Sequence, residues 1–314
     1  MSIKRPFGVT TLNGPLLQKA ALVKLVVCDL DGTLLNDKKE ISQRNLEAIA
    51  RANERGIMVT ICSGRIFTML EAYVRTLDLN VPLISANGAV VVSPQGEILS
   101  GVRLDTDDCY KTMTFAMNEG LDYIIVCDEA CYYTSSSVRV KYFVQYNEIA
   151  AQQDLDLIEL IPIPLPDGKV AESWVRGNYP QFTSLGLRKI LIYELDETRF
   201  DFVKKHIEKS TGLMVSSSDP GLLDIVAEGV DKGRGLALLA RHFGLKPEEV
   251  MVFGDFDNDL SMFEWAGFPV AMGNAITELK EHAIYITDTN TEDGVAQALE
   301  QLLLGDAKVV EARP

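Results

Sequence analysis

The chain has 314 residues, a hydrophobic fraction of 47%, a charged fraction of 24% and a net charge of −15 at pH 7. This composition is typical of a globular protein, and the length favours about two domains. A negative field repels nucleic acid and anionic lipid, and no apolar run reaches the ~18–20 residues that cross a bilayer. We therefore expect neither nucleic acid nor a membrane as a partner. The same field repels phosphorylated molecules, so a phosphate site here requires local positive charge or a metal.

The cysteines and the N-terminal segment bear on the cellular compartment. There are five cysteines, an odd number without paired CxxC spacing, which predicts reduced thiols rather than a disulfide framework or a zinc site. Residues 1–23 carry no secretory signal and are expected to form an N-terminal extension. The first acidic residue is Asp29, and an acid-poor lead also occurs in organelle import segments. We expect a cytoplasmic protein, with organelle import as the alternative.

Short apolar runs alternate with amphipathic stretches in the first hundred residues. We predict strands over 24–29, 57–62 and 82–85, helices over 42–55 and 66–77, and a hairpin over 88–99. Continuous apolar strands that alternate with helices are typical of a parallel sheet with helices on both faces.

The pattern changes at about residue 103. Helices are predicted over 107–119 and 138–146 and strands over 123–127, 131–134 and 189–195. Residues 154–186 contain four prolines and few clear periods, so they are predicted as a long loop. Strands over 222–226, 250–254 and 268–271 and helices over 232–243, from 258 and over 293–304 resume the alternation. We predict an α/β, doubly wound Rossmann-like core formed by 24–102 and 217–304, an inserted α/β cap domain over 103–216, and a tail over 305–314.

Two acidic motifs directly follow predicted strands. The segment 29–34 reads DLDGTL and the segment 254–259 reads GDFDND. In a doubly wound sheet, ligands bind beyond the carboxyl ends of the strands. Carboxylates this close raise one another's pKa, and a divalent cation relieves the repulsion; oxygen ligands of this kind suit Mg²⁺. An EF-hand calcium loop is disfavoured, because its spacing and terminal glutamate are absent.

Two further motifs provide groups that bind anions. Ser63-Gly64-Arg65 follows the second strand, where a hydroxyl, a glycine backbone and a helix N-terminus come together. Lys232 stands at the start of a predicted helix, where a cation opposes the macrodipole and requires an anionic partner. With the acidic motifs, these residues describe a cation held by carboxylates, a phosphate held by Ser63, Lys232 and Asn258, and one carboxylate able to attack.

This set of motifs resembles the haloacid dehalogenase superfamily, and specifically its Cof-type phosphatases with a large α/β cap between the second and third motifs. DLDGTLL, CSGR, VDKG and GDFDND occur in the order and rough spacing of that family, and the resemblance spans Lys24 to about Leu304. The segments 87–89 and 293–296 resemble its secondary signatures. Two features depart from the family pattern, namely the long lead and the long stretch 154–186, and they leave the substrate pocket and the oligomeric state open.

The resemblance implies roles for individual residues. Asp29 would be the nucleophile, and Asp31 would protonate the leaving oxygen and then deprotonate the attacking water. The resemblance also implies a phosphate site and a Mg²⁺ site. In the Mg²⁺ site, Asp31 would contribute its backbone carbonyl and Asp259 would lie in the outer shell. The phosphate site would be formed by Leu30, Thr33, Ser63, Gly64, Lys232 and Asn258, and the metal site by Asp29, Asp31, Asp255 and Asp259.

The expected function is hydrolysis of a small phosphomonoester, such as a sugar phosphate, through an aspartyl-phosphate. Substrate selection is assigned to the cap, because the phosphate is common to every substrate. Two alternatives remain: a phosphosugar mutase with the same intermediate, and a non-catalytic phosphate- or metal-binding regulator. Retention of both Asp29 and Asp31 argues against the regulator. The candidate specificity residues are Asn87, Glu172, Trp174 and Arg176.

Overall fold

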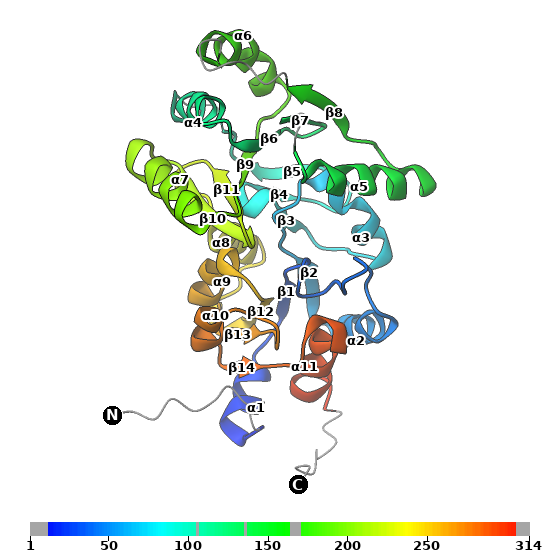
Figure 1. Ribbon diagram of the computed structural model, residues 1–314. Helices are drawn as coiled ribbons and strands as arrows, with labels where there is room; N and C mark the ends of the chain where they lie inside the picture. The colour runs from blue at the N-terminus through cyan, green and yellow to red at the C-terminus, as the bar shows by residue number, and fades with distance from the viewer. Residues whose placement is uncertain (1–11, 105–106, 135–136, 164–170, 306–314) are drawn as a thin grey trace, which may run out of the picture. The chain divides into compact units, whose positions relative to one another are not determined.

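The computed structural model describes residues 12–104, 107–134, 137–163 and 171–305. The chain divides into two compact units (Figure 1). The first contains Met1–Ser63, Leu79–Ile84 and Lys232–Pro314, and the second contains Gly64–Asp78 and Ser85–Asp231. Among the described residues, no helix has the length and apolar character needed to cross a membrane.

The first unit is built on a parallel five-stranded sheet in the order β14-β13-β12-β1-β2. Strand β1 lies between β12 and β2, with Leu25 opposite both Val250 and Met58. Every residue of β1 and β12 is buried, as expected for strands covered on both faces. The strands are β1 (Leu25–Cys28), β2 (Met58–Ile61), β12 (Val250–Gly254), β13 (Phe268–Ala271) and β14 (Tyr285–Ile286).

Helices cover both faces of this sheet (Figure 1). On one side α2 packs against α11, and the Asn45 side-chain oxygen accepts a hydrogen bond from the Ala296 amide at 2.8 Å. On the other side α9 packs against both α8 and α10. The helices are α1 (Gly14–Ala20), α2 (Gln43–Glu54), α8 (Lys232–His242), α9 (Leu260–Trp265), α10 (Thr277–His282) and α11 (Gly294–Leu302), with 3-10 turns η3 (Pro247–Glu249), η4 (Asp257–Asp259) and η5 (Asn290–Glu292). The α/β doubly wound fold predicted from the sequence is confirmed.

The second unit contains a six-stranded sheet in the order β10-β11-β9-β6-β7-β8. Its pairs are antiparallel except for β7 with β8. Helix α6 covers one face, where Phe182 packs edge-on against Tyr132 of β7 at 4.7 Å between ring centroids. The strands are β6 (Asp122–Val126), β7 (Ala130–Thr134), β8 (Glu159–Ile163), β9 (Lys189–Tyr193), β10 (Met214–Asp219) and β11 (Leu222–Val226).

The remaining elements are shorter or flank this sheet. The predicted hairpin over 88–99 is present as the antiparallel pair β4 (Val90–Val92) and β5 (Ile98–Gly101). The helix predicted over 66–77 is a 3-10 turn, η1 (Phe67–Leu70), continued by α3 (Glu71–Thr76). The other elements are β3 (Leu83–Ser85), η2 (Ala86–Gly88), α4 (Asp107–Asn118), α5 (Val140–Gln152), α6 (Ala171–Ser184) and α7 (Glu197–Ser210).

The long loop predicted over 154–186 is wrong. This stretch contains β8 and α6, separated by residues 164–170, which lie outside the described residues. Prolines concealed both elements in the sequence. Pro162 stands in an edge strand, where a missing amide donor is tolerated, and Pro180 lies inside α6.

Candidate active site

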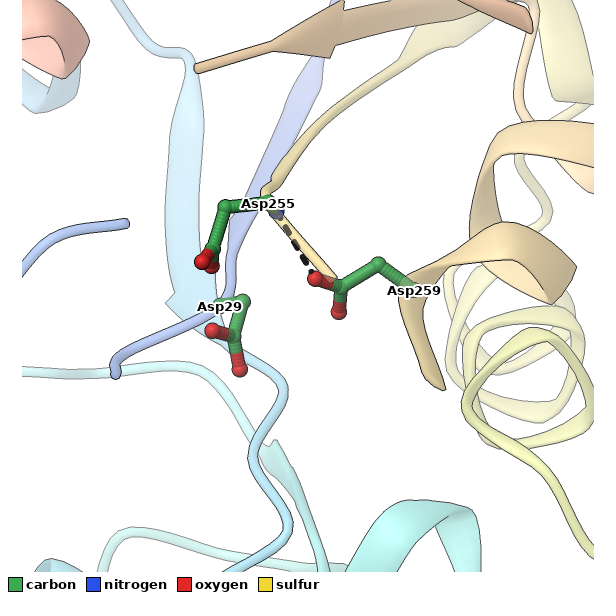
Figure 2. A group of neighbouring side chains, drawn as sticks. All are labelled: Asp29, Asp255 and Asp259. Atoms are coloured by element: carbon green, nitrogen blue, oxygen red, sulfur yellow. Dashed lines mark hydrogen bonds between the residues drawn. The ribbon is translucent and has the colours of Figure 1, made fainter. Parts of the chain in front are cut away.

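The site lies at the carboxyl edge of the parallel sheet in the first unit. Asp29 directly follows β1, Ser63 follows β2, and Asp255 directly follows β12. Because parallel strands end at the same edge, β1 and β12, which are adjacent, bring Asp29 and Asp255 together (Figure 2). The structure thus places these residues of three motifs where strand order predicts a ligand site.

The loop after β1 is tied closely to the loop after β12. The Thr33 hydroxyl donates a hydrogen bond to Asp255 Oδ1 at 2.9 Å. Gly32 has a φ of +82°, and a Cβ at this position would lie 2.2 Å from Asp255 Oδ2. Glycine is therefore required at position 32 for two reasons: the left-handed backbone and the close approach of the Asp255 carboxylate.

The Asp259 side chain stabilises the second acidic loop, residues 254–259, through hydrogen bonds to its backbone. Its Oδ2 accepts hydrogen bonds from the amides of Asp255 at 2.9 Å and Phe256 at 3.2 Å, and Figure 2 shows the first of these. A Cβ on Gly254 would come within 2.7 Å of the Asp259 side chain. The fully buried Asp259 carboxylate therefore holds the loop that presents Asp255.

Lys232 is the cation at the centre of the carboxylates. Its side chain is 1% exposed, and its Nζ lies 2.7 Å from Asp29 Oδ1 and 2.6 Å from Asp259 Oδ1. Helix α8 holds the lysine in place, because the Gly233 amide donates to Ser261 Oγ at 2.9 Å. The sequence predicted a phosphate as the anionic partner of this lysine. In the structure Lys232 pairs with two carboxylates, and its contact with phosphate stays a prediction.

Burial and the neighbouring charges shift the pKa values of Asp29, Asp255 and Lys232. Burial raises the pKa of Asp29 to about 7; Lys232 opposes the rise, and Asp259 and Asp31 add to it. It raises the pKa of Asp255 to about 8, and the neighbouring carboxylates of Asp29 and Asp259 add to the rise. Burial also disfavours the charged form of Lys232, but Asp259 and Asp29 outweigh it and hold its pKa well above the ordinary value.

The donor set fits a hard divalent cation. Asp29, Asp255 and Asp259 each place a carboxylate oxygen within 4.8 Å of the others. Three carboxylates face a single buried lysine, so the ionised cluster carries excess negative charge that a cation would neutralise. Among the described residues, the Asp31 side chain is not part of this group. Its predicted contribution through the backbone carbonyl is unaffected by that finding.

The other predicted phosphate-binding groups lie near the strand ends. Ser63 is 1% exposed, and its amide donates to the Ile84 carbonyl at 2.9 Å. Asn258 is buried in η4, between Asp255 and Asp259. Leu30 is fully buried, and its carbonyl accepts hydrogen bonds from Thr33 and Leu35.

Gly64 and the candidate specificity residues belong to the second unit. A Cβ on Gly64 would lie 2.8 Å from Asn87 Oδ1, and Asn87 is 2% exposed with a left-handed φ of +55°. Arg176 is exposed on α6, and its guanidinium lies 5.7 Å from the centroid of the Tyr110 ring. The side chains of Glu172 and Trp174 lie outside the part of the structure that is described.

Sequence reasoning missed two polar residues that contact the motif after β1. The Asn274 amide donates to the Gly32 carbonyl at 2.8 Å, and Lys39 Nζ lies 2.7 Å from Asp31 Oδ1. Asn274 follows the end of β13, so the strand-end rule that selected Asp29 and Asp255 would also have selected it. Lys39 had no such signal, because a lysine in a polar turn is ordinary.

Comparison with known proteins agrees with this geometry. The family model described as haloacid dehalogenase-like hydrolase matches residues 26–166 and 176–299. A curated relative from Bacillus subtilis, 5-amino-6-(5-phospho-D-ribitylamino)uracil phosphatase YwtE, is 30% identical over 90% of this chain and 99% of its own length. Phosphatase YwpJ of the same organism is 29% identical over 90% of this chain and 100% of its own length.

A solved structure shares the fold as well. A haloacid dehalogenase-like hydrolase from B. subtilis superposes with a TM-score of 0.72 at 28% identity, covering 90% of this chain and all of that one. The family match spans all four motifs, including Asp29, Ser63, Lys232 and Asp255. The chain belongs to the haloacid dehalogenase-like hydrolase family.

Proposed function

We propose that this enzyme is a Mg²⁺-dependent phosphatase that hydrolyses a small phosphomonoester through an aspartyl-phosphate on Asp29. One observation carries the proposal: Asp29 is buried at the carboxyl edge of the sheet, bonded to Lys232, with Asp255 and Asp259 beside it. A carboxylate held in this way can act as a nucleophile and can also be a ligand of a bound cation. The names of the relatives, which are phosphatases, support the same reaction class.

The proposed first step transfers the phosphoryl group to the enzyme. Asp29 attacks phosphorus, the bond from phosphorus to the leaving oxygen breaks, and Asp31 gives its proton to that oxygen. Lys232 supplies positive charge beside the nucleophile, which opposes the negative field of the chain. Asp29, Asp255 and the backbone carbonyl of Asp31 would hold Mg²⁺, which when bound neutralises charge on the transferring group.

The proposed second step restores the enzyme. Asp31, now ionised, takes a proton from a water molecule that attacks phosphorus, and the bond between phosphorus and Asp29 breaks. Phosphate leaves and Asp29 is again a carboxylate. Ser63 and Asn258, both buried, are the proposed hydrogen-bond donors to the phosphoryl oxygens in both steps.

The proposed substrate is a small phosphorylated metabolite, selected by groups outside the phosphate site. The phosphate groups cannot distinguish one phosphomonoester from another, so discrimination requires contacts to the remainder of the molecule. We assign these contacts to the cap proposed over 103–216, with Glu172, Trp174 and Arg176 as candidates. Asn87, beside Gly64, is the candidate outside that segment.

A phosphate-release screen tests the proposal. Phosphorylated metabolites, including sugar phosphates and the compound named for the B. subtilis relative, are incubated with enzyme and Mg²⁺, and free phosphate and isomeric products are measured. Asp29→Asn should abolish release, because an amide does not attack phosphorus, whereas Asp37→Asn, at an exposed position in the same loop, should not. Turnover by Asp29→Asn within about tenfold of wild type would refute the nucleophile assignment. An isomer in place of free phosphate would identify a mutase.

A further inference from the structure

A lysine outside every motif contacts the proposed acid–base residue. Lys39 Nζ lies 2.7 Å from Asp31 Oδ1, and both side chains are partly exposed. We propose that Lys39 is a positioning residue, which holds the Asp31 carboxyl group in place for proton exchange with the leaving oxygen. This inference rests on the phosphatase function proposed above.

The loop that carries Lys39 is fixed at both ends. Leu35 is fully buried, and it forms β-bridges with Asp31 on one side and with Ile41 on the other. Its amide also donates to the Leu30 carbonyl at 2.9 Å. The segment therefore folds back toward the residues that follow β1, and its tip is at residues 36–40.

Asn36 closes that tip. Its side-chain oxygen accepts hydrogen bonds from the amides of Lys38 at 2.9 Å and Glu40 at 3.1 Å. Its own amide donates to the Glu40 carbonyl at 3.0 Å, and the Lys39 amide donates to the Asn36 carbonyl at 2.9 Å. Four hydrogen bonds within five residues define the backbone from which the lysine side chain extends.

The turn places Lys39 in a conformation that lysine disfavours. Its φ is +62°, in the left-handed region where glycine and asparagine are the usual residues. From this constrained backbone the Lys39 side chain extends to Asp31, and its Nζ donates a hydrogen bond to Asp31 Oδ1. The ion pair thus restricts the rotamers of Asp31. It engages Oδ1, and proton exchange with the leaving oxygen requires only the other carboxyl oxygen, Oδ2.

Leaving-group dependence distinguishes positioning from a structural role. When the bond to phosphorus breaks, its electron pair passes to the leaving oxygen, and a strongly basic oxygen needs the proton from Asp31. A weakly basic oxygen, such as nitrophenolate, departs with little help. Loss of positioning should therefore slow substrates with basic leaving groups selectively, whereas loss of folded protein would slow all substrates equally.

The experiment compares Lys39→Met with a matched control, Lys38→Met, which removes the same charge from an exposed neighbouring residue. kcat/KM is measured at saturating Mg²⁺ for an alkyl phosphate and for aryl phosphates of graded leaving-group basicity. Lys39→Met should lower kcat/KM for the alkyl phosphate roughly 10- to 100-fold, the range found when the hydrogen-bond partner of a metal ligand is removed, with little change for nitrophenyl phosphate. Lys38→Met should follow wild type throughout, and Lys39→Arg should restore most of the rate.

A double-mutant cycle with Asp31→Asn completes the test. If Lys39 acts through Asp31, adding Lys39→Met to Asp31→Asn should cause almost no further loss. A uniform loss across leaving groups, full additivity, or a faster Lys39→Met enzyme would overturn the proposal. If the wild-type enzyme releases no phosphate from any substrate, the proposed function itself fails. If Asp31→Asn slows substrates with basic leaving groups selectively and Lys39→Met does not, only the positioning role of Lys39 fails.

Discussion

Replacement of Lys232 by methionine tests the electrostatics of the site most directly. Methionine keeps much of the volume but removes the charge that bonds Asp29 at 2.7 Å and Asp259 at 2.6 Å. Removing one partner of a buried ion pair leaves an uncompensated charge and costs about 3–5 kcal/mol. We expect a loss of this size in the free energy of unfolding of the first unit, in metal-free buffer at alkaline pH.

The pH dependence follows from the carboxyl groups. In the presence of Lys232, the pKa of Asp29 is raised to about 7 and that of Asp255 to about 8, mainly by burial. A carboxyl whose folded pKa is raised contributes stability at low pH, and this contribution is lost as pH rises through the folded pKa. Lys232 lowers both pKa values, so its removal raises them further. The loss should therefore be larger at about pH 9 than at about pH 5.5, where both groups are protonated.

The assay follows urea unfolding by the fluorescence of Trp265, in a Trp174→Phe background. The chain has two tryptophans, and Trp265 lies on α9, which packs against the helix that begins with Lys232. The matched control is Lys24→Met, because Lys24 pairs with Glu249 at 2.6 Å but is 62% exposed, so water screens the pair. A Lys232→Met loss no larger than that of the control, or equal at both pH values, would refute this reasoning.

Three further predictions concern the metal, the first acidic loop and the proposed cap. EDTA should remove activity and Mg²⁺ should restore it, and Asp255→Ala should raise the Mg²⁺ concentration needed; full activity of metal-free enzyme would contradict this. Gly32→Ala should abolish activity and lower the thermal midpoint, because a Cβ would lie 2.2 Å from Asp255 Oδ2, and an unchanged midpoint would show that the loop adapts. Trp174→Ala and Arg176→Ala should alter the pattern of KM values across substrates, and the selection role fails if every KM stays at its wild-type value.

Local patterns were sufficient where structure depends on neighbours along the chain. Apolar runs predicted β1, β2, β12 and β13 but not the two-residue strand β14, and the rule that ligands bind at the carboxyl ends of such strands placed Asp29, Ser63 and Asp255 at one edge. The same patterns failed at β8 and α6, because Pro162 and Pro180 are disfavoured in regular elements unless an edge strand or helix packing tolerates them. Only pairing with β7 reveals that 159–163 is a strand.

The amino-acid sequence alone was sufficient to predict the family and the fold class, and it supplied the proposed residues of the site. Three of the four motifs are contiguous segments that follow strands of the parallel sheet, whereas Lys232 begins α8. Which side chains contact one another depends on the tertiary structure. Lys232 bonds Asp29 across 203 residues of chain, because β1 and β12 are adjacent and α8 begins beside them. Lys39 contacts Asp31 because a turn closed by Asn36 holds it in a left-handed conformation. Such contacts depend on strand order and on backbone angles set by several hydrogen bonds, neither of which local composition encodes.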